Sequence, residues 1–312
     1  MRTPSRLRRR WSAGLVAIGL VACAAEPTVD ARRAAPITTT PWIHGVADGA
    51  TPTDPPIEVR SFGPDTFVLR QSKSVHFEAP FLFLLCGGSR ALLLDTGATR
   101  DAAKFPLRAT VDRLLEERRV ARGDDAAPPL IVAHTHAHGD HVAGDRQFQD
   151  RPNTTIVGRR APEVAAFFEF VEWPRDIVTF DLGERELTLL GIPGHEDASI
   201  ALFDERTGWL LTGDTVYPGR LYVRDWPAFK ASIHRLARFA RTHDVSWVVG
   251  THVEMSTTPG VDFPMGATYQ PNEHPLELAP AVLDELEAAL DDAGDTPTRI
   301  VRASFIVEPI NR

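Results

Sequence analysis

The sequence predicts an α/β fold in which sheets and helices form a layered sandwich. Short apolar runs of strand length interleave along the chain with segments that have helical spacing. Early in the chain, Gly87-Gly88-Ser89 separates two such runs, 81–86 and 91–94, which is a strong signal for a β-hairpin. Because strands joined by a hairpin are antiparallel, a layered α/β sandwich is favoured over a purely parallel sheet.

The N-terminus has the pattern of an export signal. Arginines at positions 2, 6, 8, 9 and 10 precede an apolar segment, 11–22, that is too short to span a membrane as a stable anchor. The segment ends in Leu-Val-Ala-Cys23, which resembles the lipobox of bacterial lipoproteins, where the cysteine is lipidated. We therefore expect a signal peptide over 1–22 and lipidation at Cys23. An ordinary cleavable signal with an incidental cysteine, or a short uncleaved anchor, is the alternative.

Residues 23–56 are rich in alanine, proline and threonine, which is typical of an extended spacer, so the folded domain is expected over 57–312. Ala24 follows the cysteine. By resemblance to Gram-negative lipoproteins, this implies a lipid-anchored protein in the outer membrane that faces the periplasm. The one other cysteine, Cys86, lies in an apolar run and is expected to be a small core residue without a disulfide.

The elements of the domain follow from local patterns. Residues 57–69 alternate well enough for a strand or hairpin, 102–120 combine helical spacing with many charges, and 226–241 are amphipathic. The remaining strands are expected over 130–133, 154–157, 187–192, 199–203, 209–211, 245–249 and 298–307, and the remaining helices over 161–170 and 276–290.

Length and charge limit the classes of function. A chain of 312 residues can bury a full core. Its formal net charge is −8, and because residues 1–22 contribute five arginines and no acid, the rest of the chain is more acidic still. This acidity argues against nucleic acid as a partner. It leaves the oligomeric state open.

Residues 134–141 contain four histidines and one aspartate, directly after an apolar run that we expect to be a buried strand. In extended backbone, side chains two apart point to the same side, so His136 and His138 can bind one ion. His134 begins the cluster but falls outside this spacing, and we expect it to support the site from the strand end rather than bind metal.

The turn at Gly139 re-aims Asp140 and His141, which suits them to a second ion nearby. Imidazole and carboxylate ligands favour zinc, with iron and manganese as alternatives. Three later segments repeat one arrangement, in which an apolar strand and a glycine precede a side chain that can bind metal. These segments end at His195, Asp214 and His252. Strand ends that converge on one edge of a sandwich would build a single site there.

These motifs resemble the metallo-β-lactamase fold superfamily of metallohydrolases over residues 57–312, because His-x-His-x-Asp-His and the three later ligands occur in the family's order. The resemblance implies a four-layer αβ/βα sandwich. It also implies that Asp95, in Leu-Leu-Leu-Asp-Thr-Gly, braces the metal loops. The implied ligands are His136, His138 and His195 for the first metal and Asp140, His141 and His252 for the second, with Asp214 bridging both.

The expected activity is that of a dinuclear metal-dependent hydrolase. Two divalent ions about 3.5–4 Å apart can share a bridging hydroxide that attacks the carbonyl of an ester, thioester or lactone. Asp140 would orient this nucleophile and move a proton to the leaving group. The bridging Asp214 makes the ligand set similar to that of the hydroxyacylglutathione hydrolases. Alternatives are a zinc β-lactamase, a persulfide dioxygenase-like iron enzyme, and a binding protein with a vestigial site.

The substrate is expected to be a small acyl compound. Residues 217–226 are unusually aromatic and basic, so Tyr217, Arg220 and Tyr222 are candidate contacts, with arginine as the clamp for an anion. The alternative is a loop that packs its aromatic side chains onto the following helix. The long segment 253–275 is expected to cover the site, and His76 could line the cleft.

Overall fold

The computed structural model of the chain describes Met1 and residues 35–310. The expected lipidation site Cys23 and the signal peptide, apart from Met1, lie outside the described residues. Except for Met1, every described residue belongs to the second of the two units of the chain, Ala34–Arg312. Among the described residues, none of the helices combines the length and apolar character needed to span a bilayer.

The first half of the domain forms a six-stranded sheet in the order β1-β2-β3-β4-β5-β6. The strands β1 to β4 pair antiparallel with their neighbours, whereas β4, β5 and β6 run parallel. The strand bounds are β1 Ile57–Ser61, β2 Thr66–Gln71, β3 Phe81–Cys86, β4 Ala91–Leu94, β5 Leu130–Ala133 and β6 Thr154–Ile156.

The second half forms a six-stranded sheet in the order β13-β12-β10-β9-β8-β7 and a three-stranded sheet in the order β11-β15-β14. Within the six-stranded sheet, β10 and β12 are parallel. The bounds are β7 Ile177–Asp181, β8 Glu186–Gly191, β9 Ile200–Asp204, β10 Trp209–Gly213, β12 Trp247–Gly250 and β13 Glu277–Leu278, and in the small sheet β11 Arg220–Val223, β14 Ile300–Val301 and β15 Ile306–Pro309.

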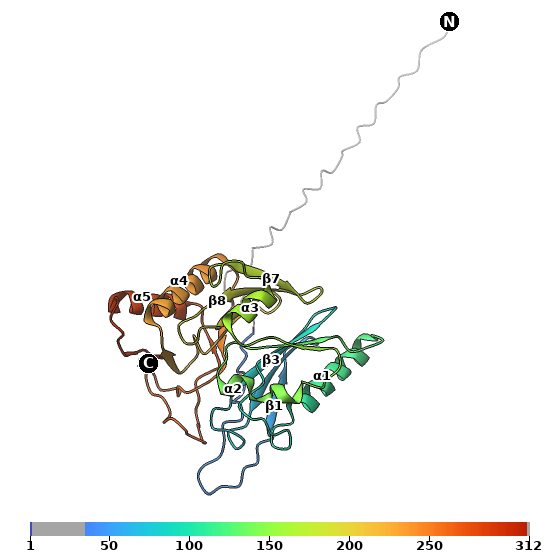
Figure 1. The fold of residues 1–312 in the computed structure, drawn as a ribbon, viewed down its shortest axis with the longest axis horizontal. Helices are drawn as coiled ribbons and strands as arrows, with labels where there is room; N and C mark the ends of the chain where they lie inside the picture. Colours follow the sequence, from blue (N-terminus) through green and yellow to red (C-terminus); the bar gives the residue numbers. More distant parts are fainter. Residues whose placement is uncertain (2–34, 311–312) are drawn as a thin grey trace. The chain divides into compact units, whose positions relative to one another are not determined.

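Helices α1, α4 and α5 cover the outer faces of the two large sheets (Figure 1). Helix α1 packs on the first sheet, and helices α4 and α5 pack side by side on the second. The order of layers is therefore helix, sheet, sheet, helix, which confirms the predicted four-layer sandwich. The helix bounds are α1 Leu107–Arg122, α2 Gly139–Val142, α3 Ala161–Phe168, α4 Trp226–Thr242 and α5 Ala281–Ala293.

The core follows from the two-residue period of the strands. In β3, Phe83 points into the core between the sheets, whereas its neighbour Leu84 points to the core under α1. In β10, Leu211 faces the core between the sheets and Leu210 faces α4 and α5. Each large sheet is thus apolar on both faces, as a sheet that is covered on both sides must be.

Most elements lie where the sequence predicts them, within a few residues. The structure differs at α1, which begins at Leu107 rather than at 102, with Pro106 as its N-terminal cap residue. The segment 276–290 divides into β13 and α5, and 298–307 divides into β14 and β15. Strands β7 and β11 were not predicted. In β7, exposed and half-buried residues alternate, so the strand lacks a continuous apolar run.

The structure also differs from the expectation of a tether that extends to residue 56. Ile37 and Trp42 are buried in the core between the sheets. The backbone N–H and the hydroxyl of Thr38 both donate to the carboxylate of Glu277. These contacts hold the described part of the segment on the domain, so the folded part begins before Ile57. The Ala/Pro/Thr-rich composition of the segment does not reveal this packing, because only one isoleucine and one tryptophan anchor the segment to the core.

Candidate metal centre

All the predicted metal ligands follow the C-terminal ends of four strands. Strand β5 leads into His136 and His138, β8 into His195, β10 into Asp214 and β12 into His252. Because β8 and β10 both pair antiparallel with β9, they run in the same direction, and β12 is parallel to β10. These strands therefore deliver their ligands to one edge of the second sheet, and β5 delivers its pair from the first.

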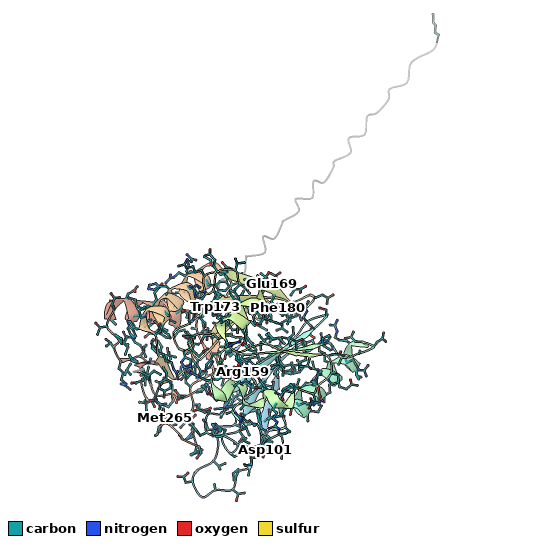
Figure 2. All side chains as sticks on the ribbon, viewed as in Figure 1. Asp101, Arg159, Glu169, Trp173, Phe180 and Met265 are labelled. Carbon is teal, nitrogen blue, oxygen red and sulfur yellow. The ribbon has the colours of Figure 1, made fainter. Side chains whose placement is uncertain are left out.

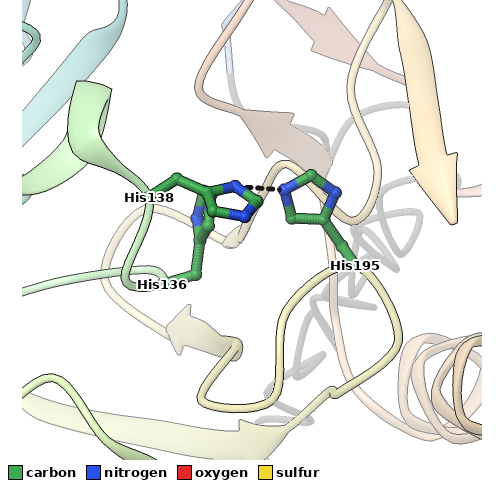
Figure 3. A group of neighbouring side chains, drawn as sticks. All are labelled: His136, His138 and His195. Atoms are coloured by element: carbon green, nitrogen blue, oxygen red, sulfur yellow. Dashed lines mark hydrogen bonds between the residues drawn. The ribbon is translucent and has the colours of Figure 1, made fainter. Parts of the chain in front are cut away.

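The first group consists of His136, His138 and His195. Nε2 of His136 and Nε2 of His195 each lie 3.0 Å from Nδ1 of His138 (Figure 3). A single proton on His138 cannot serve both neighbours, whereas a cation can accept a lone pair from each of the three rings. This donor set fits a divalent metal such as zinc.

The second group consists of Asp140, His141, Asp214 and His252. Oδ2 of Asp140 lies 3.2 Å from Nε2 of His141 and 3.3 Å from Nε2 of His252. The two imidazole Nε2 atoms are 3.4 Å apart, which is close enough for both to bind one metal ion. Two imidazoles and two carboxylates form a second donor set that suits zinc, iron or manganese.

Asp214 lies between the two groups. Its Oδ2 is 3.7 Å from Nε2 of both His136 and His195, and 3.5 Å from Nε2 of His141. Its Oδ1 is 3.5 Å from Nε2 of His252. One carboxylate thus reaches the donor atoms of both groups, which is the position that a bridging ligand needs.

In four of these histidines, the ring nitrogen Nδ1 already has a hydrogen-bond partner in the protein. Nδ1 of His195 lies 2.8 Å from the carbonyl oxygen of Tyr222, and Nδ1 of His252 lies 3.1 Å from that of Glu78. Nδ1 of His141 contacts the carboxylate of Asp95, and Nδ1 of His136 contacts the hydroxyl of Thr135. Partners of this kind hold the proton on Nδ1 and leave the Nε2 lone pair for a metal, so the residues fit metal ions.

Asp95 directly follows β4 and contacts the histidine loop at two points. Its Oδ1 accepts from the backbone N–H of Thr135 at 2.7 Å, and its Oδ2 lies 2.9 Å from Nδ1 of His141. The residue has a φ of 69°, a left-handed conformation that aspartate tolerates better than most side chains. These contacts join the end of β4 to the histidine loop, and the bracing role that the family resemblance implies stays a prediction.

Gly213 explains how Asp214 reaches the centre. The glycine has a φ of 55°, and a Cβ at this position would lie 2.7 Å from Cβ of Thr135. A side chain here would therefore both strain the backbone and separate β10 from the loop that carries the histidines. The hydroxyl of Thr251 donates to Oδ1 of Asp214 and holds the carboxylate in place.

The first group is held in the neutral form. Burial lowers the pKa of His136 and of His195, and it lowers the pKa of His138 to about 4. Three neutral imidazoles therefore present free lone pairs at neutral pH, and a metal ion meets no competing proton there.

In the second group, the carboxylates outweigh burial. Burial alone would lower the pKa of His141 and His252, but Asp214 and its acidic neighbours hold the pKa of His141 well above its usual range and raise that of His252 to about 9. Burial would raise the pKa of Asp214, yet the histidines around it keep the pKa of this carboxyl well below its usual range. Without metal, the second group is thus a cluster of ion pairs between protonated histidines and carboxylates. A metal ion that binds there displaces the protons of these histidines.

His134 does not join either group, as its place outside the ligand spacing predicts. Its Nε2 lies 2.8 Å from Oδ1 of Asp145, a carboxylate that also binds the hydroxyl of Thr96 and the guanidinium of Arg159. Thr96 connects this cluster to the histidine loop, because its hydroxyl also lies 3.2 Å from the carbonyl oxygen of His141. Asp145 was not predicted as a site residue, because nothing in its local sequence marks it.

Of the three expected substrate contacts, the structure brings only Tyr222 to the cleft. Tyr217 is 2% exposed, and its hydroxyl donates to the carbonyl oxygen of Arg220. The guanidinium of Arg220 pairs with Glu254 at 3.0 Å and Asp262 at 2.6 Å, so it holds the covering segment in place instead of facing the cleft. Tyr217 packs in the core cluster that also contains Trp226 and Phe229 of α4, as the alternative describes, whereas Arg220 pairs with acidic residues of the covering segment.

Two pockets border the centre, and we refer to them as the larger and the smaller part of the cleft; of the residues that line them, Glu78 is common to both. The larger part, of about 660 Å³, lies beside Asp140 and is bordered by His76, Arg100 and Lys104. The smaller part, of about 60 Å³, lies beside His252 and is bordered by residues of the covering segment 253–275. Among these, His76 and the covering segment follow the sequence-based expectation. The two cations were not predicted, because nothing in their local sequence marks them.

Comparisons with known proteins agree with this geometry. A family model described as the metallo-beta-lactamase superfamily matches residues 78–252, more than half of the chain. The solved metallo-beta-lactamase FIM-1 from Pseudomonas aeruginosa, in its mono-zinc form, superimposes with a TM-score of 0.50 at 16% identity over 80% of this chain and 100% of that chain. At this identity, the likeness shows the fold alone.

Curated relatives are similar over shorter stretches. The acyl-coenzyme A thioesterase MBLAC2 of Bos taurus is 30% identical over 174 residues, which cover 46% of this chain and 60% of the relative. The hydroxyacylglutathione hydrolase of Methylococcus capsulatus is 30% identical over 113 residues, which cover 34% and 42%. The chain thus spans less than two thirds of the length of these relatives.

Proposed function

This chain belongs to the metallo-beta-lactamase superfamily, and from that premise we propose that it is a dinuclear metal-dependent hydrolase that cleaves a thioester. The observation that carries the proposal is the place of Asp214, whose carboxylate reaches donor atoms of both groups. Zinc suits the donor atoms best. The preference for a thioester over an ester or lactone is supported by the names of two relatives, a thioesterase and a hydroxyacylglutathione hydrolase.

When bound, two divalent ions would supply an activated water and stabilise the negative charge that develops on the substrate carbonyl. The residues of the chain set the geometry. Asp95 and Asp214 orient the imidazoles, while the backbone carbonyls of Tyr222 and Glu78 hold His195 and His252. Four of the five imidazoles are buried and that of His138 is half-buried, which limits the competition of bulk water for their lone pairs.

We assign the proton transfer to Asp140. Its side chain remains 21% exposed, whereas the side chain of His141 is fully buried, and it borders the larger part of the cleft. The carboxylate would orient the attacking water, accept its proton and pass it to the leaving thiolate. In the balanced reaction, a C–O bond forms, the C–S bond breaks, and water leaves its hydroxyl on the acid and its proton on the thiol.

A metal analysis and a substrate panel test this function together. We expect two zinc ions per chain by plasma mass spectrometry and metal-dependent cleavage of a coenzyme A or glutathione thioester. A p-nitrophenyl ester, a lactone and nitrocefin should be poorer substrates. Nitrocefin turnover faster than every thioester would indicate a β-lactamase instead. Iron together with oxygen uptake would indicate a dioxygenase, and either result would overturn the proposal.

We also propose that the protein is exported and anchored by a lipid at Cys23, facing the periplasm. The arginines, the apolar segment 11–22 and the Leu-Val-Ala-Cys sequence support this. In a Gram-negative host, the wild-type protein should fractionate with outer membranes, and a Cys23→Ala protein should not. Membrane association that survives the substitution would contradict the lipid anchor.

A further inference from the structure

We propose that His76 is a catalytic hydrogen-bond donor, whose neutral ring donates from Nε2 to the sulfur of the leaving thiol while the C–S bond breaks. The inference rests on the proposed function and adds a residue to the same site. It is carried by two contacts of the Glu78 backbone, one with the ring of His76 and one with the metal ligand His252.

The backbone of Glu78 orients two imidazoles. Its N–H donates to Nδ1 of His76 at 3.3 Å, and its carbonyl oxygen lies 3.1 Å from Nδ1 of His252. A carbonyl oxygen only accepts, so Nδ1 of His252 carries a proton and Nε2 is free for metal. A backbone N–H only donates, so Nδ1 of His76 is the acceptor, and the proton of the neutral ring is on Nε2. One residue thus prepares one ring to bind metal and the other to donate.

The segment between β2 and β3 holds His76 in place. The backbone N–H of His76 donates to the carbonyl oxygen of Ser72 at 3.1 Å, and its carbonyl oxygen accepts from the N–H of Ala79 at 3.1 Å. At the start of β3, the N–H of Phe81 donates at 2.8 Å to the carbonyl oxygen of Thr251, which directly follows β12. The position of His76 is therefore tied to a strand end that delivers a metal ligand.

The ring of His76 borders the larger part of the cleft. Three titratable side chains that line this part are half-buried, namely His76, Glu78 and Asp140. Asp101, labelled in Figure 2, and two cations line it as well, but all three are exposed. Within the described part of the chain, the only hydrogen bond of the His76 ring is the one at Nδ1, so Nε2 is available to a substrate. Because ionised carboxylates accept, the imidazole is the donor among the three half-buried groups.

The surroundings of the ring favour its neutral form. Burial lowers the pKa of His76; the charge of Asp140 opposes this effect and that of His252 adds to it. The ring of Phe77 stacks on the imidazole with 5.0 Å between the centroids. A neutral imidazole holds its proton tightly, so it donates a hydrogen bond without transferring the proton.

The role of His76 leaves the balance of the reaction unchanged. The oxygen of water forms the C–O bond, the C–S bond breaks, and the electron pair of that bond goes to sulfur. Nε2–H of His76 donates to sulfur while negative charge develops there, and the proton that neutralises the thiolate comes from Asp140. Because both residues border the same part of the cleft, a sulfur that binds there can contact both.

The first experiment compares two substitutions of His76 in the zinc-loaded full chain. The amide oxygen of asparagine can replace Nδ1 and accept from Glu78, but asparagine is too short to donate from the position of Nε2, which the amide of glutamine reaches. For the acetyl thioester of N-acetylcysteamine, kcat should fall about 10–100-fold in His76→Asn and less than about threefold in His76→Gln. His243→Asn, at an exposed histidine directly after α4, is the matched control. Unchanged kcat in His76→Asn, or equal losses in both variants of His76, would overturn the inference.

The second experiment separates a donor to sulfur from a structural role. The acetyl thioester of N-acetylcysteamine, an alkyl thiol, is compared with that of thiophenol, a more acidic aryl thiol. An acidic thiolate leaves without a hydrogen bond, so for the aryl thioester the loss in His76→Asn should shrink to less than about threefold. The zinc content of every variant should equal that of the wild type. Equal losses for the two thioesters would show that the substitution acts through the fold and would overturn the inference.

A measurement without turnover separates this inference from the proposed function. Long-range proton–nitrogen NMR of the zinc-loaded wild type identifies the protonated nitrogen of each imidazole, and the signals lost in His76→Asn are those of His76. A neutral ring with its proton on Nε2 supports the donor even if no thioester is cleaved, a result that would overturn the proposed function alone. A ring with its proton on Nδ1, or a ring charged at pH 7, would overturn the inference even if thioesters are cleaved.

Discussion

Oδ2 of Asp95 lies 2.9 Å from Nδ1 of His141, and both side chains are completely buried. This contact joins the end of β4 to the loop that carries the histidines. It fixes the side of the imidazole that faces the metal centre, and the carboxylate that makes it is held by the N–H of Thr135. Asp95 therefore contacts the second group without being one of its four donors, and we expect it to prepare the group for metal.

Replacement of Asp95 by asparagine should weaken metal binding. Asparagine tolerates the left-handed backbone at this position, so the change removes the charge and leaves the fold intact. We expect the affinity of the second group for zinc to fall about 10–100-fold, as measured by competition with a chelating dye. Asp150→Asn, at an exposed aspartate, is the control. Unchanged affinity in Asp95→Asn would refute the bracing role.

Replacement of Asp214 by alanine should uncouple the two groups. The loss of a carboxylate that reaches both should lower the zinc content from two ions to one in native mass spectrometry, and reduce kcat at least about 100-fold. A variant that kept two ions and full activity would contradict the bridging role.

The affinity for metal should depend on pH in a direction set by His252. Its pKa is raised to about 9, so below that pH the metal-free protein holds a proton that zinc must displace. Affinity should therefore rise with pH at least up to about 9, because His141, whose pKa is also raised, holds a second proton in the same group. The ion pairs that raise this pKa stabilise the metal-free protein fully below pH 6.5, and this stabilisation is lost as the pH rises through 9. Calorimetry at pH 7 in buffers of different ionisation enthalpy should detect proton release, and its absence would count against the assignment.

A side chain at position 213 should disrupt the contact between the sheets. Gly213→Ala adds a strained left-handed residue and a clash with Thr135, which together should cost about 2–4 kcal/mol of unfolding free energy. Gly123→Ala is the matched control, because its φ is also positive but a Cβ there meets nothing within 4 Å. Denaturant titrations of the metal-free proteins measure both. Equal losses would show that the clash is absent.

The ion pair between Arg185 and Asp204 should be important for stability. It is fully buried, with a distance of 2.7 Å, and Arg185 also donates to the carbonyl oxygens of Asp65, in the turn before β2, and of Cys86, at the end of β3. Arg185→Met leaves a buried carboxylate unpaired and should cost about 3–5 kcal/mol. Arg299→Met, in an exposed pair with Glu308, should cost less than about 1 kcal/mol. Similar values in urea titrations would contradict this difference.

The sequence alone was sufficient to predict the features that depend on residues close together in the chain. The spacing of His136, His138, Asp140 and His141 depends on a strand end and one turn, and a glycine precedes each of the three later ligands. The structure brings these seven side chains into two groups, and the apolar runs become the strands that carry them. The apolar period of the strands and the spacing of the ligands are the same in the folded protein, because both depend on residues only a few positions apart.

Tertiary structure alone decided which other residues surround the centre. Tyr217 and Arg220 carry the side chains expected of substrate contacts, yet Glu254 and Asp262, more than thirty residues later, bind Arg220 away from the cleft. Ile37 enters the core from a segment whose composition indicates a spacer, while Gln270 and Arg100 reach the cleft from loops without a motif. The burial of a side chain and its ion pairs depend on residues that are distant in the sequence. A local sequence pattern does not show which distant residues these are.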